Sequence, residues 1–130
     1  MEQLVIEASA KTPKIVFDPL NNQYEIVGES RPENVNAFFE PVFSWLENYL
    51  TYLKSNGKKD GFTLKMYLEY FNSASAKYFL NLTKKLNEFK SAGIPVAIEW
   101  CYIEEDDDMK EAGEEIEQLS NIPFKFTVVQ

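Results

Sequence analysis

The second half of the chain switches repeatedly between the hydrophobic spacing of a strand and that of a helix. Apolar and polar residues alternate over 62–70, which predicts a strand with one buried and one wet face. Apolar residues then recur at helical spacing over 73–92, and strand and helix patterns follow at 96–103, 106–119 and 124–128. Such a β-α-β-α-β order predicts parallel neighbouring strands joined by right-handed crossovers.

The first third of the chain predicts strands at 4–6, 14–18 and 23–28, the last two joined as a hairpin across Pro19–Asn22. A long helix is expected to follow, with Ser30 and Glu33 at the spacing of a capping box and apolar residues recurring to Leu53. Pro41 falls inside this pattern and predicts either a bend or a later helix start.

These segments together predict one α/β domain over residues 1–130, with an N-terminal β-hairpin, a mixed sheet and about three helices. The wet face of the 62–70 strand indicates that helices do not cover the sheet evenly. In the last helix, Met109, Ala112, Ile116 and Leu119 are expected to face the core.

Composition excludes several classes of site. The chain has no histidine, which removes imidazole-based catalysis and zinc binding, and Cys101, its only cysteine, reads as a buried strand residue. A net charge of −8 disfavours binding to nucleic acid or to an anionic membrane. No apolar run is long enough for a membrane span and no signal peptide is apparent, so a cytoplasmic protein without cofactor or metal is expected.

The acidic run at 104–108 has a simple structural interpretation. It lacks the alternating ligands, the glycine and the distal glutamate of an EF-hand loop. Negative charge at the start of a helix is stabilised by the helix dipole, so the run is expected to be a solvated helix start and part of an acidic docking face.

The junction Asn72-Ser73-Ala74-Ser75 allows two interpretations. Asn72 or Ser73 can cap the following helix by accepting a hydrogen bond from a free backbone amide. Alternatively, a serine at a helix N-terminus can carry a phosphate without unfolding the protein, because the free amides and the dipole favour an anion there. On the residues alone, the cap is the simpler interpretation.

Four segments along the chain resemble the SiaC-type regulatory phosphoproteins of bacteria: TPKIVFD at 12–18, GESRPENVNAFFEPVFSWL at 28–46, LEYFNSASAK at 68–77 and GIPVAIEWCY at 93–102. The resemblance implies an α/β (STAS-like) fold similar to anti-sigma-factor antagonists, and a protein that is not an enzyme. It also implies a phosphorylation switch set by a dedicated protein kinase and a PP2C-type phosphatase, whose unphosphorylated form binds and activates a diguanylate cyclase and so raises cyclic di-GMP.

The family modifies a threonine directly after the asparagine of the third segment, and Ser73 occupies that position here. The resemblance therefore implies a phosphoserine at Ser73, next to the helix cap Asn72, with Ser75 as a possible second site. The competing hypothesis is a constitutive adaptor or homo-oligomer in which Asn72 and Ser73 only cap a helix. An enzyme ranks third, because the chain offers no nucleophile paired with a base.

Overall fold

The computed structural model describes all 130 residues and contains six strands and three helices in an α/β arrangement. The elements in chain order are β1 (Leu4–Ile6), β2 (Lys14–Asp18), β3 (Gln23–Ser30), α1 (Val35–Ser55), β4 (Phe62–Phe71), α2 (Ser73–Ser91), β5 (Val96–Ile103), α3 (Asp107–Ser120) and β6 (Phe124–Val129). The α/β class, the N-terminal hairpin and the order of elements predicted from the sequence are confirmed.

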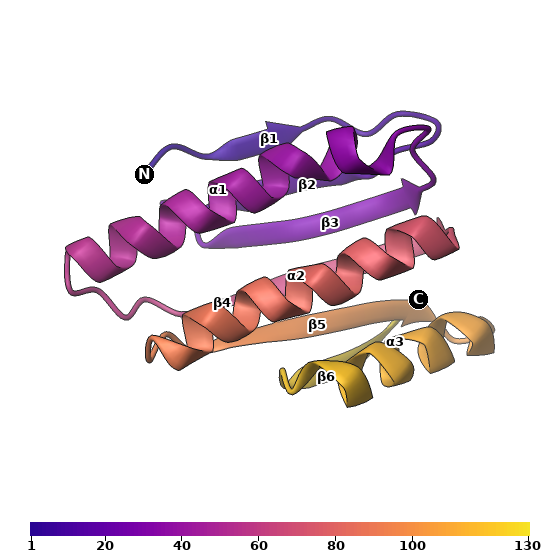
Figure 1. Cartoon of the computed structure of the whole chain (residues 1–130). Coiled ribbons are helices and arrows are strands. Elements are labelled where there is room, and N and C mark those ends of the chain that lie inside the picture. Colours follow the sequence, from indigo (N-terminus) through magenta and orange to yellow (C-terminus); the bar gives the residue numbers. More distant parts are fainter.

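All strands belong to one sheet whose spatial order, β1-β2-β3-β4-β5-β6, is also the order along the chain. The pairs β1–β2 and β2–β3 are antiparallel, whereas β3–β4, β4–β5 and β5–β6 are parallel. Each parallel connection moves in the same direction across the sheet, so right-handed crossovers put all three helices on one face. Figure 1 shows α1, α2 and α3 side by side in front of the sheet, with no helix behind it.

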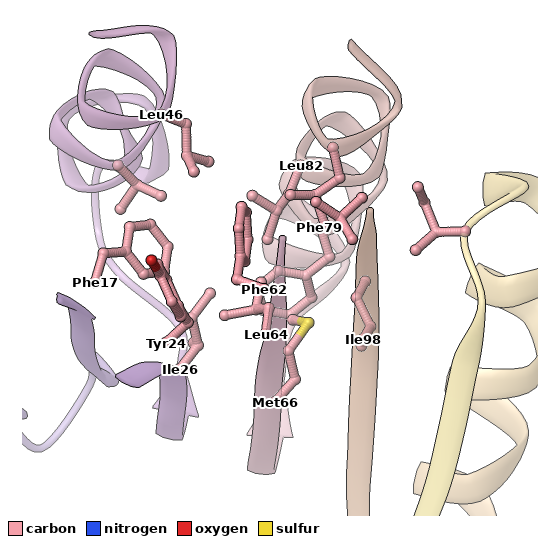
Figure 2. Packing of buried hydrophobic residues seen from close by; sticks show 14 of the residues in the cluster. Phe17, Tyr24, Ile26, Leu46, Phe62, Leu64, Met66, Phe79, Leu82 and Ile98 are labelled. Atoms are coloured by element: carbon pink, nitrogen blue, oxygen red, sulfur yellow. The ribbon is translucent and has the colours of Figure 1, made fainter. Parts of the chain in front are cut away.

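The hydrophobic core fills the space between the helices and the sheet (Figure 2). In β4, Phe62, Leu64, Met66 and Leu68 are buried beneath the helices, while Thr63 and Lys65 are exposed on the other side. The predicted wet face of β4 is therefore confirmed.

Trp100, on the helix-facing side of β5, fixes the position of α3. Its side chain is buried, and the indole Nε1–H donates to the carbonyl oxygen of Met109 at 2.9 Å. A Cβ atom added at Gly113 would lie 2.5 Å from the indole ring, so α3 can approach β5 this closely only with glycine there. The indole ring also packs against Phe71 and Phe124.

Two sequence predictions about the helices are wrong. The cap of α1 is Asn34, whose side chain accepts from the Ala37 amide, and not Ser30, which ends β3 in a buried position. Leu119 is 71% exposed, because it lies in the last turn of α3 on the side away from the sheet, whereas Met109 and Ile116 are buried as expected. Pro41 lies within α1, so its carbonyl partner four residues earlier lacks the usual amide donor.

No helix in the structure is both long enough and apolar enough to span a membrane.

Candidate functional site at the start of helix α2

The turn from β4 into α2 is built around Asn72. Its side-chain oxygen accepts a hydrogen bond from the Ser75 amide at 2.9 Å, which makes it the N-cap of α2. Its own amide donates to the carbonyl oxygen of Ser30 at 3.1 Å, so the cap is also tied to the end of β3. Of the two cap candidates in the sequence, the structure selects Asn72.

Ser73 is the first residue of α2, and its side chain is exposed. The first intrahelical bond runs from the Ala76 amide to the Asn72 carbonyl oxygen, so the amides of Ser73 and Ala74 precede the hydrogen-bonded ladder. No side-chain hydrogen bond of the structure uses the Ser73 hydroxyl, which is free to be modified without disturbing the cap.

Ser75 is in a different environment from Ser73. It is fully buried, with its Oγ atom 2.8 Å from the Ser30 Oγ and 3.0 Å from the Ser30 carbonyl oxygen. These contacts join the first turn of α2 to the last residue of β3. A kinase cannot reach the Ser75 hydroxyl in this fold, so the structure argues against Ser75 as a second phosphorylation site.

The charges around Ser73 suit an added anion. The first turn of α2 has no acidic residue, whereas α3 begins with Asp107 and Asp108 behind its cap Asp106. Lys77 lies one turn after Ser73, is exposed and forms no ion pair. A phosphate on Ser73 would therefore be stabilised by the positive end of the helix dipole, where the first turn has no carboxylate. It would also lie at the favourable i, i+4 spacing from Lys77.

Other residues from the sequence analysis lie away from this site. Cys101 is buried in β5, and burial raises the pKa of its thiol, with a further rise from the charge of Glu99. Asp106 to Asp108 form the cap and first turn of α3, which confirms the predicted helix start, and Glu104 and Glu105 lie in the turn before the cap. The structure contains no group of three or more carboxylates and cysteines arranged to hold a metal ion.

A hollow of about 370 Å³ escaped the sequence analysis. It lies at the ends of β4 and β5, between those strands and the start of α3, and is lined by residues including Tyr67, Tyr102 and Met109. Tyr70, three residues before Ser73, borders a second hollow of the same size and is 50% exposed. The sequence does not signal this surface: Tyr70 continues the alternation over 62–70 and is expected on the buried face, but the register of β3 and β4 shifts between Gly28 and Glu29, next to Tyr70, and that expectation is wrong.

Alanine substitutions at Asn72 and Ser73 should show which of the two residues stabilises the start of α2. Asn72→Ala is expected to lower the free energy of unfolding by about 1 kcal/mol, because the Ser75 amide loses its acceptor. Ser73→Ala removes a hydroxyl that bonds to nothing, so a change within about 0.5 kcal/mol is expected. Urea unfolding followed by circular dichroism measures both, and a larger loss for Ser73→Ala than for Asn72→Ala would contradict this assignment.

Comparison with known proteins agrees with this architecture. The family model for the SiaC family of regulatory phosphoproteins matches residues 6–129. An uncharacterised protein of Pseudomonas aeruginosa strain UCBPP-PA14 is 29% identical over 124 residues, which cover 95% of this chain and 94% of that protein.

Solved structures show the same relationship. Apo-SiaC from Pseudomonas aeruginosa superposes with a TM-score of 0.86 at 27% identity, covering 98% of this chain and 100% of that chain. SiaC in the crystal structure of the diguanylate cyclase SiaD with its activator SiaC, from the same organism, also gives 0.86 at 27% identity, over 97% of this chain and 99% of that chain. The chain therefore belongs to the SiaC family of regulatory phosphoproteins.

Proposed function

We propose that this protein is a non-catalytic switch whose unphosphorylated form binds and activates a diguanylate cyclase, and whose phosphorylation on Ser73 ends that binding. Membership of the SiaC family and the likeness to a SiaC that is the activator of the diguanylate cyclase SiaD support the choice of partner. The whole chain acts as one regulatory domain in the cytoplasm, where cyclic di-GMP is made.

The proposal rests on one observation: Asn72 caps α2, whereas the exposed Ser73 hydroxyl has no structural role. Because Asn72 caps α2, the exposed Ser73 hydroxyl can gain and lose a phosphate while the fold stays intact. The phosphate adds about −1.5 to −2 charges at pH 7, three residues after the half-exposed Tyr70. A partner docked over this edge of the sheet would meet a new bulky anion and dissociate.

Reversal of the switch needs two enzymes, a protein kinase and a PP2C-type phosphatase, that both act on Ser73. Each must reach the serine in the folded protein, and Ser73 is exposed whereas Ser75 is fully buried. This difference supports Ser73 as the only modified residue of the pair.

Binding of variants to a purified diguanylate cyclase from the same cell tests the proposal. Ser73→Ala is expected to bind and activate like the unphosphorylated wild type, and Ser73→Glu to bind at least about tenfold more weakly because of its added charge. Ser91→Glu is the matched control, since it adds the same charge to an exposed serine at the opposite end of α2.

Affinity is measured by titration calorimetry, and activation by the rate of cyclic di-GMP synthesis. Circular dichroism shows whether Ser73→Glu is folded. If the folded Ser73→Glu variant binds and activates as well as the wild type, a constitutive adaptor is favoured instead. Equal weakening by Ser73→Glu and Ser91→Glu would mean that only overall charge matters and that Ser73 has no special position.

A further inference from the structure

The face of the sheet away from the helices carries an alternating row of charges. Glu25 of β3, Lys65 of β4, Glu99 of β5 and Lys125 of β6 are paired in register, each directly beside the next. Residues in register on neighbouring strands point to the same face, and the helices cover the opposite one (Figure 1). The uncovered face therefore presents glutamate, lysine, glutamate and lysine in a line across four strands.

The two lysines of this row have no ionic partner within the chain. The salt bridge formed by the row is Lys14–Glu25, at 3.8 Å, and neither Lys65 nor Lys125 lies within 4 Å of a carboxylate oxygen. Both lysines are exposed. Their charges are thus available to a second surface that carries carboxylates at the same spacing.

The next row on the same face is much less polar. Val27, Tyr67, Cys101 and Thr127 stand in register across the same four strands. Cys101 is only 1% exposed, and the other three are half-buried, so this row forms a strip of largely buried side chains. A strip of partly buried side chains beside two lysines without ion pairs suits the face of another sheet.

The order of the charges selects one symmetric arrangement of two copies. A two-fold axis parallel to the strands, placed between β4 and β5, exchanges β3 with β6 and β4 with β5. Lys65 then faces Glu99 of the other copy and Glu25 faces Lys125, so every glutamate meets a lysine. A two-fold axis along the row would instead place like charges opposite one another, which disfavours that arrangement.

The net negative charge of the molecule lies in a segment outside this face. Residues 104–117 contain nine carboxylates and one lysine, which account for the whole net charge of −8, and the rest of the chain is neutral. Most of these residues belong to α3, on the opposite side of the sheet (Figure 1). Two copies can therefore approach through their uncovered faces with the least mutual repulsion.

We propose that the uncovered sheet face is the interface of a homodimer, in which the row Glu25-Lys65-Glu99-Lys125 pairs with the same row of a second copy in reverse order. Stacked sheets lie about 10 Å apart, a gap that a lysine and a glutamate side chain bridge from opposite sides. The two central Lys65–Glu99 pairs lie next to the axis and set the register of the dimer. The helix side, including Ser73, stays free for other partners.

Two charge reversals test the dimer without relying on one variant. Lys65→Glu alone places two glutamates opposite each other, and Glu99→Lys alone places two lysines opposite each other, so each should weaken self-association about 100-fold or more. A mixture of the two variants restores glutamate–lysine pairing at every position of the row. Mixing two monomeric variants is therefore expected to yield a heterodimer.

Sedimentation velocity of the full chain over a range of concentrations measures the association. Lys84→Glu, the same reversal on the helix side, is the control and should dimerise like the wild type. A wild type that stays monomeric at every concentration, a mixture that stays monomeric, or single variants that dimerise like the wild type would each overturn the proposal. If a single variant does not fold, Lys65→Glu/Glu99→Lys serves instead; it keeps every intermolecular pair and must dimerise.

Discussion

Ser75→Glu is expected to lower the free energy of unfolding by about 4 kcal/mol or more, the largest effect of any single substitution near the proposed switch. The Ser75 side chain is fully buried, and its hydroxyl bonds to both the hydroxyl and the carbonyl oxygen of Ser30. A carboxylate there loses its hydration, meets no cation and leaves the Ser30 hydroxyl without its partner. Since a domain of this kind is stable by only about 5–15 kcal/mol, the first turn of α2 should detach or the chain unfold.

Ser73→Glu provides the matched comparison two residues away. The same side chain at the exposed first position of α2 is favoured by the helix dipole, so the stability should change by less than about 1 kcal/mol and in the stabilising direction. Urea unfolding of both variants followed by far-UV circular dichroism makes the measurement. Similar stability of the two variants would show that Ser75 is accessible in solution and would reopen it as a phosphorylation site.

Trp100→Ala is expected to lower the free energy of unfolding by about 3–5 kcal/mol. The buried indole fills the space between β5 and Gly113 of α3 and packs against Phe71 and Phe124. Its removal leaves a cavity between β5 and α3. The cavity stays open because Gly113, on the helix side, has no side chain that could fill it. The effect should be largest on α3, because Gly113 of this helix packs directly against the indole ring.

Trp100→Phe is the control for the indole nitrogen. It keeps an aromatic ring but loses the hydrogen bond from Nε1 to the Met109 carbonyl oxygen, so a smaller loss, about 1–2 kcal/mol, is expected. Chemical denaturation gives the free energies, and amide hydrogen exchange shows whether α3 loses protection first. An alanine variant no less stable than the phenylalanine variant would contradict the packing role of the ring.

Local patterns were sufficient to predict most of the fold. The alternation of Phe62, Leu64, Met66 and Leu68 with polar residues identified β4 and its wet face. The helical spacing over 73–92 predicted α2, which ends at Ser91, two residues before Gly93 with its φ angle of +81°. These signals depend on neighbours within a few positions, which is why they can be read without a structure. The uncovered face of the sheet followed from the same alternation.

Long-range contacts account for the predictions that failed. Ser30 and Glu33 have the spacing of a capping box, but the Ser30 hydroxyl bonds to Ser75, which is 45 positions away in the chain. The choice between Asn72 and Ser73 as cap, and the burial of Ser75, likewise depend on where β3 ends in space. Leu119 has the helical spacing of a core residue, but the buried side of α3 is formed by Met109, Gly113, Ile116 and Ser120, and Leu119 lies on the opposite side.

The strand order of the sheet also bears on how the chain can fold as it is made. No strand inserts between two earlier ones, so each new strand adds to an edge that already exists. Contacts between neighbours in sequence favour fast folding, because little chain must be closed into loops before the contacts form. A chain leaving the ribosome can therefore build its sheet one strand at a time, and its incomplete forms expose a single growing edge.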